Sequence, residues 1–218
     1  MNSTYVVIPV WDNAVDLTDT VNKLKGGYVA PETYEKQSFN FETKELTTEE
    51  VAHPYAGQTG PDFTGKIVVV NFKPGYTAID GVTHLEYFDE LNVYKAWNMG
   101  IAHAEANGAH SILVLNSVVD FDPFAVKDAY DLMNNENTQV VNIADGAIIL
   151  FAAASTIKPD DQFKIWFGDN DIFRRAGALL SLSRSEYINV SDKQAHVHDA
   201  AFDAVVKEDE VKYNAKSY

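Results

Sequence analysis

The sequence predicts a single α/β domain with a mostly parallel central sheet and helices on both of its faces. Short unbroken apolar runs occur at Tyr5–Val10, Lys66–Asn71 and Ser111–Asn116, and such runs are typical of strands that helices cover on both sides. Segments with helical apolar periodicity separate these runs, which is the pattern of α/β folds. The 218 residues are enough for one sizeable core and too few for two comfortable domains.

Composition and charge narrow the function classes. The chain carries 32 acidic and 17 basic residues, and the net charge of −15 argues against a broad basic surface for nucleic acid. It has no cysteines, so disulfides and thiolate metal sites are excluded. No apolar run approaches the roughly 20 residues that span a bilayer, and the first residues lack the features of a signal peptide. We therefore expect a soluble, cytoplasmic protein.

The first strand, Tyr5–Val10, is followed by a helix with an apolar stripe over residues 17–24 that Gly26-Gly27 closes. This start is common in nucleotide-binding folds. Neither GxGxxG nor GxxxxGK[ST] is present, however, so dinucleotide-binding and P-loop interpretations lose their main support.

The polar segment Tyr28–Gly65 departs from this regular alternation. Phe39 and Phe41 alternate within it, and Thr47 with Glu50 forms a capping-box pattern. We expect a hairpin or irregular excursion plus a short helix, and such a long connection is more often a functional flap than a core element.

The strand Lys66–Asn71 comes next, and a second capping-box pattern, Thr83 with Glu86, predicts a helix that turns Leu85, Phe88 and Leu91 inward. Asn92 then caps the start of another helix, which Gly108 ends. The apolar stripe of that helix is Tyr94, Trp97, Ile101 and Ala104.

The second half of the chain looks more antiparallel. Asp122-Pro123 is a typical helix start, and Gln139–Ile143 and Gly146–Ala153 are strand candidates joined by a tight link. The chain closes with an amphipathic stretch around Phe202.

Polar residues follow the strand Ser111–Asn116 directly. In an open parallel sheet, ligands bind beyond the carboxyl ends of the strands, and Asn116, Ser117, Asp120 and Asp122 stand at such an end. Oxygen-rich loops of this kind suit hard cations such as magnesium or manganese. Asp122 has a simpler role as a helix cap, whereas Asp120 has no such structural explanation.

Asp169 and Asp171 are candidate catalytic carboxylates because they follow a stretch rich in Trp and Phe. Apolar surroundings raise a carboxylate's pKa and make it a better proton acceptor near neutrality. The alternative is that Asp169 merely caps the helix that carries Phe173. His196 and His198 alternate and would face the same side of an extended segment, as metal ligands do, or are simply two exposed histidines.

Asn98 and Gly100 are unusual inside a helix, because glycine destabilises a helix by roughly 1 kcal/mol relative to alanine. Close packing or the approach of a ligand would explain them, and a local flaw is the alternative.

Four segments together resemble family 2 glycosyltransferases. KAWNMGIAHAEANGAHSILVLN is similar to the family's N-x-G-x-x-x-A segment and the strand that ends in LN-x-D, and FGDNDIFRRAG is similar to its later D-x-D-hydrophobic-x-x-R segment. YVVIPVWDN and IVVVN resemble the family's first two strands. The matches occur in the family's order and cover about half of the chain.

The resemblance implies a single GT-A-like, Rossmann-type domain over residues 1–218. Residues 1–123 would bind a nucleotide-sugar donor, with an excursion at 28–65, and residues 124–218 would bind the acceptor. The nucleotide-sugar site would comprise Pro9, Val10, Trp11, Asn71, Asn98, Asn116 and Ser117. Asp169 would be the base that deprotonates the acceptor hydroxyl in a single inverting displacement, with Asp171 beside it in the same motif.

The sequence departs from the family where an aspartate usually follows LN by two residues, because Val118 stands there. Asp120, aided by His198, would replace it as the ligand of a divalent Mn or Mg ion. Otherwise the chain is metal-independent or inactive.

Alternative functions are a nucleotidyltransferase, which would release pyrophosphate, and a degenerate module that binds nucleotide sugars without turnover. The acceptor is a hydroxyl on a glycan, a protein or a modified DNA base. The acidic charge weighs against DNA, whereas the basic residues Lys164, Arg174, Arg175 and Arg184 keep it open.

Overall fold

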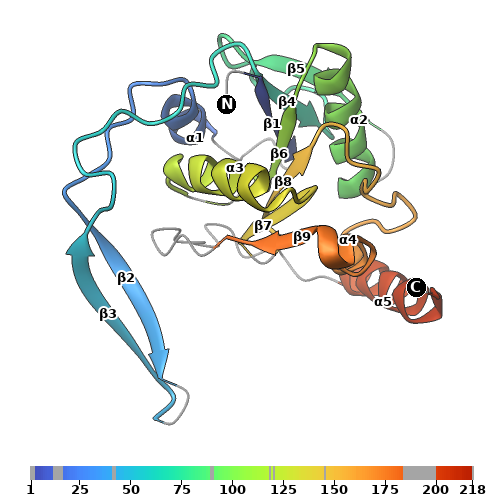
Figure 1. Cartoon of the computed structure of the whole chain (residues 1–218). Coiled ribbons are helices and arrows are strands. Elements are labelled where there is room, and N and C mark those ends of the chain that lie inside the picture. The colour runs from blue at the N-terminus through green and yellow to red at the C-terminus, as the bar shows by residue number, and fades with distance from the viewer. Residues whose placement is uncertain are drawn as a thin grey trace.

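The fold was analysed in a computed structural model (Figure 1). It describes residues 3–11, 17–40, 43–88, 91–117, 119, 121–144, 146–183 and 200–217. None of the helices in these ranges is long and apolar enough to cross a membrane.

Seven of the described strands form one mixed, mostly parallel sheet in the order β5-β4-β1-β6-β8-β7-β9. Their bounds are β1 Thr4–Val10, β4 Ile67–Asn71, β5 Thr83–Glu86, β6 Ser111–Leu115, β7 Val140–Ala144, β8 Ile148–Ala152 and β9 Leu180–Leu182. Strand β8 runs antiparallel to both of its neighbours, β6 and β7, and the other pairs are parallel. The carboxyl ends of β1, β4, β5, β6, β7 and β9 therefore point to one edge of the sheet, which we call the carboxyl edge.

Helices cover both faces of the sheet, as the sequence predicts (Figure 1). The bounds are α1 Thr18–Leu24, α2 Val93–Ala106, α3 Phe124–Glu136, α4 Gly168–Ala176, the short 3-10 helix η1 Gly177–Leu179 and α5 Ala200–Ala215. Side chains of β1 alternate between the faces: Val6 and Ile8 pack with α1 and α3, whereas Val7 packs with α2. Every residue of β4 and β6 is buried, so the predicted two-sided burial of these runs is confirmed.

Helix α2 begins and ends where the sequence predicts. The Asn92 side chain accepts a hydrogen bond from the amide of Lys95 at 2.8 Å, and Gly108 takes a left-handed φ of +79° just after the helix. A Cβ on Gly100 would lie 2.2 Å from Cγ1 of Val7. Close packing against β1 therefore explains this helical glycine.

Two helices expected from capping-box patterns are wrong. Thr83 and Glu86 bound strand β5, which pairs with the exposed edge of β4, and Thr47 and Glu50 lie in strand β3. In both places main-chain pairing with a neighbouring strand outweighs a local capping signal of two residues.

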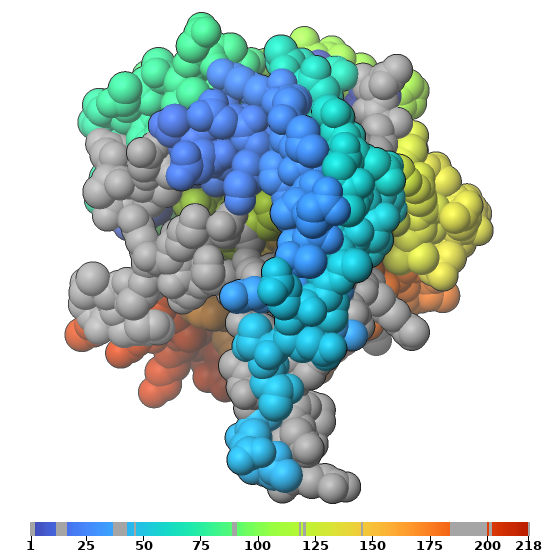
Figure 2. Space-filling view, turned by 90° about the vertical axis from the view of Figure 1, so that its left-hand side faces the viewer, coloured from blue at the N-terminus to red at the C-terminus, as the bar shows by residue number. Residues whose placement is uncertain are grey.

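The Tyr28–Gly65 excursion contains a hairpin of β2, Thr33–Asn40, and β3, Glu45–Ala52. The hairpin extends from the body as an arm (Figures 1 and 2). The base of the arm is fixed to the start of α3. The Tyr28 hydroxyl donates to the carboxylate of Asp122, His53 Nε2 lies 3.2 Å from the same carboxylate, and Tyr55 stacks on Phe124.

Candidate functional site

The carboxyl edge brings several of the predicted nucleotide-sugar residues together. Pro9 and Val10 of β1 pair in register with Val70 and Asn71 of β4. Asn116 directly follows β6, which pairs with the other side of β1. Val10, Asn71 and Asn116, which are 45 to 106 positions apart in sequence, therefore lie at one edge, because three parallel strands end side by side.

Asn71 carries a buried polar atom that no described residue meets. Among the residues that the structure describes, its Oδ1 has no hydrogen-bond partner, and its Nδ2 lies 3.5 Å from Nδ1 of His84. His84 Nε2 accepts the amide hydrogen of Ile79 at 3.0 Å, so a neutral His84 carries its proton on Nδ1 and would donate to a turned amide. In either orientation one polar group of Asn71 meets no partner among the described residues. A buried polar group left unpaired destabilises a protein by about 1–3 kcal/mol, and a hydrogen bond to a ligand would remove that cost.

Trp11 lies at the end of β1 with 40% of its surface exposed. Its ring meets Phe72 edge to face at 5.5 Å between centroids, and Nζ of Lys73 lies 5.0 Å from the ring centroid. An exposed aromatic surface beside a cation therefore stands at the same edge as Asn71.

Asn116 and Ser117 form the turn after β6. The amide of Asn116 donates to the carbonyl of Ala147 at 2.9 Å, and its own carbonyl accepts from the amide of Val119 at 3.2 Å. The end of β6 is thereby joined to the β7–β8 turn.

Asp169 lies at that same turn. It is in the first turn of α4 and is half-buried, and the absence of a side chain at Gly146 makes room for it, because a Cβ there would lie 2.2 Å from Oδ2 of Asp169. The N-cap position belongs to Phe167, so Asp169 is not the N-cap residue of this helix. The carboxyl edge therefore holds a chain of contacts, from Asn116 to the β7–β8 turn at Gly146 and Ala147, and from that turn to Asp169.

Asp171 has a different environment. Its side chain is fully buried and accepts from Nε of Arg175 at 2.7 Å, and it also binds Nζ of Lys216. Two cations satisfy this carboxylate in the interior, which favours an ion-pairing role over the catalytic one predicted from the motif.

Asn98 acts in the scaffold. Its amide donates to the carbonyl of Pro159 at 2.9 Å and ties α2 to the loop before α4. The asparagine of the N-x-G-x-x-x-A segment therefore holds α2 and the loop before α4 together in this structure.

The predicted metal ligands Asp120 and His198, together with Val118, lie outside the described residues. Among the residues that are described, no group of three or more His, Asp or Glu side chains gathers to hold a metal ion.

Tyr94 contacts the candidate site, although the sequence predicts for it only a place in the apolar stripe of its helix. Its hydroxyl donates to the carbonyl of Ile165 at 3.2 Å and accepts from the amide of Gly168 at 3.1 Å. Burial raises the pKa of Tyr94 well above its ordinary value, and the negative charge of Asp169 adds to the rise. Tyr94 therefore stays protonated beside the segment that leads into Asp169. Its place in an apolar stripe hid this role.

The basic residues that left DNA as a possible acceptor make contacts within the protein. Arg174 lies over the ring of Tyr213 at 4.4 Å, Lys164 lies 3.8 Å from Glu208, and Arg175 pairs with Asp171. Arg184 lies outside the described residues.

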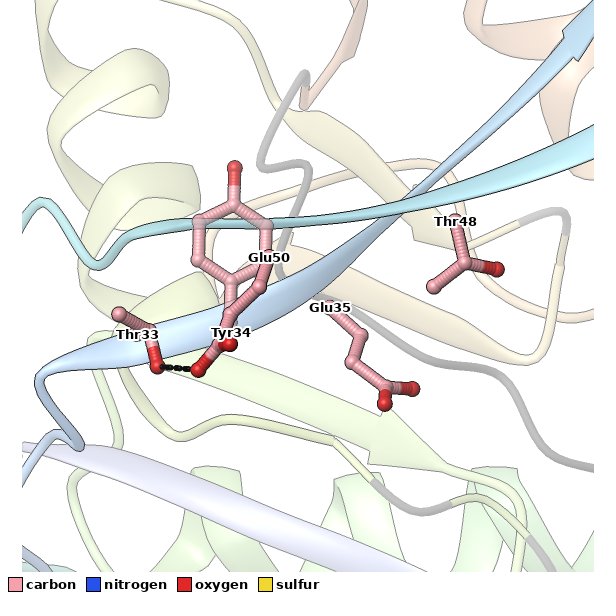
Figure 3. A pocket seen from close by; sticks show the side chains of 5 residues that line it. All are labelled: Thr33, Tyr34, Glu35, Thr48 and Glu50. Carbon is pink, nitrogen blue, oxygen red and sulfur yellow. Dashed lines mark hydrogen bonds between the residues drawn. The ribbon is translucent and has the colours of Figure 1, made fainter.

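A shallow hollow of about 410 Å³ lies on the arm, away from the carboxyl edge. It is lined by Thr33, Tyr34, Glu35, Thr48 and Glu50, and Thr33 donates to Glu50 at 2.5 Å (Figure 3). The facing carboxylates of Glu35 and Glu50 give it an acidic character unrelated to the predicted site.

Comparisons with known proteins support the fold assignment. No protein-family model matches the sequence, and no curated protein matches it. Among solved structures, residues 1–349 of S. aureus TarS align with a TM-score of 0.55 and 12% identity over 99% of this chain and 72% of that chain.

A TarS structure in complex with UDP-GlcNAc aligns with a TM-score of 0.53 and 14% identity over 99% of this chain and 68% of that chain. A longer TarS structure aligns with a TM-score of 0.53 and 13% identity, and this chain, 99% covered, spans 44% of it. The chain therefore has the GT-A-like fold that the sequence resemblance predicts.

Proposed function

We propose that this protein is a glycosyltransferase that moves a sugar from a nucleotide-diphosphate sugar to an acceptor hydroxyl. The observation that carries the proposal is the position of Asp169, a half-buried carboxylate against Gly146, at the sheet edge where Asn71 ends β4 and Asn116 follows β6. The likeness to TarS, which has been solved with UDP-GlcNAc, supports a donor of this class.

For donor binding, we propose the residues of the carboxyl edge, Pro9, Val10, Trp11, Asn71, Asn116 and Ser117. The unpaired polar group of Asn71 would hydrogen-bond to the donor, and the exposed ring of Trp11 with Lys73 offers a surface for a flat base and a negative charge. Asn98 would support this side indirectly by holding the loop at Pro159.

For the chemical step, we propose inversion with Asp169 as the general base. The carboxylate takes the proton of the acceptor hydroxyl as the hydroxyl oxygen forms its bond to the anomeric carbon. The bond from that carbon to the phosphate oxygen breaks, and the nucleoside diphosphate leaves with the electron pair. A group that removes the proton in the transition state contributes about 10²–10⁴-fold to the rate.

A divalent Mn or Mg ion would balance the charge on the leaving diphosphate when bound. Its proposed ligands remain Asp120 and His198, and every step above is assigned to residues of the carboxyl edge without it.

Removal of the Asp169 carboxylate tests this proposal. A thermal-shift screen of nucleotide sugars, with and without manganese, first identifies the donor, because a bound ligand stabilises the folded state by mass action. With that donor, Asp169→Asn is expected to lower the kcat of transfer at least about 100-fold while the donor-induced shift persists. Asp161→Asn, an exposed carboxylate on the loop before α4, is the matched control and keeps its rate.

Product analysis separates the alternatives. Release of a nucleoside diphosphate supports the proposal, whereas release of pyrophosphate indicates a nucleotidyltransferase. Donor binding without hydrolysis or transfer indicates a binding module, and full transfer by the Asp169→Asn variant would rule out the proposed base.

A further inference from the structure

The segment Lys164–Gly168, which leads directly into Asp169, is bound by an internal carboxylate. Asp209 of α5 is fully buried. It accepts the consecutive backbone amides of Lys164 at 2.9 Å, Ile165 at 2.9 Å and Trp166 at 3.2 Å through Oδ2. A carboxylate that gathers three amides from one stretch of chain fixes the path of that stretch, because charge-assisted hydrogen bonds are about twice as strong as neutral ones.

Other groups of α5 reinforce this contact. Lys212 lies 3.7 Å from Asp209 and donates to the carbonyl of Gln162 at 2.7 Å. Tyr213 lies against Phe167, with 5.4 Å between ring centroids. Helix α5 also contacts α4, because Arg174 lies over the ring of Tyr213 and Lys216 binds Asp171 (Figure 1).

Helix α2 holds the same segment from the other side. The Tyr94 hydroxyl binds the carbonyl of Ile165 and the amide of Gly168. Between these two attachments Phe167 adopts a left-handed φ of +64°, a conformation that costs a non-glycine residue about 1–3 kcal/mol and persists only where the surroundings impose it. The turn that delivers Asp169 to the carboxyl edge is therefore enforced by Asp209 and Tyr94 together.

We propose that Asp209 is a positioning residue: through the amides of Lys164–Trp166 it holds the Phe167 turn, and thereby Asp169, in place for the reaction. This inference rests on the proposed role of Asp169 as base. A displacement of about 1 Å at a reacting group lowers a rate by about 100-fold, so loosening of this turn is felt in the chemical step and not in donor binding.

The test compares Asp209→Asn with Glu210→Gln, which removes the same charge from the exposed neighbouring position of α5. The probe is the nucleotide sugar that the thermal-shift screen identifies, with UDP-GlcNAc tried first. An asparagine removes the negative charge that strengthens the three bonds and places an NH₂ group where Oδ1 meets the amide of Lys164 and Nζ of Lys212. We expect Asp209→Asn to lower kcat at least about tenfold with donor KM within about twofold, and Glu210→Gln to leave both unchanged.

Two further measurements separate positioning from stability. Hydrogen exchange at the amides of residues 164–166 is expected to accelerate at least about tenfold in Asp209→Asn under conditions where the variant is fully folded. In an Asp169→Asn background, Asp209→Asn is expected to lower the residual rate no further, because it acts through Asp169.

The outcomes are distinct. Equal rates for the wild type and Asp169→Asn would overturn the proposed base and the positioning role with it. A clear loss in Asp169→Asn together with an unchanged kcat in Asp209→Asn, or equal effects of Asp209→Asn in both backgrounds, overturns the positioning role alone. If Asp209→Asn does not fold, Tyr94→Phe removes the opposite attachment, and an unchanged kcat in that variant overturns the proposal.

Discussion

At the scale of single residues, environment separates two carboxylates that the sequence presents as a pair. Asp169 and Asp171 are two positions apart on α4 and point about 200° apart around the helix axis. One lies beside Gly146 at the carboxyl edge, and the other is buried between Arg175 and Lys216. A proton acceptor has to reach the acceptor hydroxyl, and Asp169 is the one of the two that is half-exposed.

Gly146→Ala is expected to displace the Asp169 carboxylate. The new Cβ would lie 2.2 Å from its Oδ2, so either the carboxylate or the β7–β8 turn moves, and we expect a loss of kcat of about tenfold or more with donor binding retained. Steady-state kinetics with the donor thermal shift measures both quantities.

Gly65→Ala is the matched control for that variant. Gly65 has a similar positive φ, +73° against +82° for Gly146, and nothing lies within 4 Å of a Cβ built there. Both variants carry the backbone strain of about 1 kcal/mol or more, and only Gly146→Ala adds the clash. Equal kinetics in the two variants would contradict the placement of Asp169.

At the scale of elements, the end of α5 is tied to the loop before α4 through one lysine. Lys216 binds Asp160 at 2.7 Å and also binds Asp171. Burial by itself would raise the pKa of Asp160, but hydrogen bonds from Lys216 and Gln162 lower it below the ordinary value of 3.8. Burial by itself would lower the pKa of Lys216, but its bonds to the two carboxylates raise it above 10.5.

Lys216→Met is expected to reduce the free energy of unfolding by about 1.5–3 kcal/mol near neutral pH, the range for hydrogen bonds to charged groups. The lowered pKa of Asp160 contributes stability that is present above pH 3.8 and is lost as pH falls through the folded-state pKa. The raised pKa of Lys216 contributes stability that is present below pH 10.5 and is lost as pH rises through the folded-state pKa.

Urea unfolding of the wild type and Lys216→Met across pH measures this contribution. The difference between the two stability curves should shrink as pH falls below 3.8 and as pH rises above 10.5. A difference that stays constant between pH 3 and pH 7 would show that the methionine acts through packing and not through the ion pairs.

At the scale of the whole molecule, the arm is separate from the sheet that carries the site. Strands β2 and β3 of the hairpin pair with each other. At the base of the hairpin the amide of His53 donates to the carbonyl of Glu32 at 2.9 Å. Tyr28, His53 and Tyr55 anchor the base on α3, below the hairpin.

Replacing residues 33–52 with Asn-Gly is expected to leave the body folded, because the ends that must be joined already lie within hydrogen-bonding distance. The melting temperature should change by less than about 4 °C, the shift that corresponds to about 1 kcal/mol in a protein of this size, and the donor-induced thermal shift should persist. Loss of cooperative unfolding would show instead that the arm is part of the core.

Much of the fold was predictable because the relevant signals are local. An unbroken apolar run such as Lys66–Asn71 has one stable location, a strand covered on both faces. The two ends of α2 are likewise set locally, because the Asn92 side chain caps the first turn and Gly108 readily adopts the positive φ that ends the helix. The capping-box patterns at Thr47 and Thr83 failed because strand pairing depends on a partner distant in sequence. The outcome for Thr83–Glu86 was decided by the free edge of β4.

The candidate site was predictable only in part. Asn71 and Asn116 were predictable because ligands bind beyond the carboxyl ends of parallel strands. Asp169 was predictable from the resemblance of FGDNDIFRRAG to the family's D-x-D-hydrophobic-x-x-R segment. Asp209 and Tyr94 were missed because one belongs to a charged amphipathic helix and the other to an apolar stripe, and nothing local distinguishes a carboxylate that collects three amides from a solvated one.

The sequence by itself determined the α/β architecture, the buried strands β1, β4 and β6 and the polar residues at their ends, because apolar periodicity and caps act within one element. Only the tertiary structure decided that Asp169 rather than Asp171 faces the carboxyl edge, and that α5 fixes the turn before it. Those outcomes depend on burial and on contacts between segments that are 23 to 71 residues apart, such as Gly146 with Asp169, Tyr94 with Ile165 and Asp209 with Ile165. Contacts over such separations form when the whole chain packs.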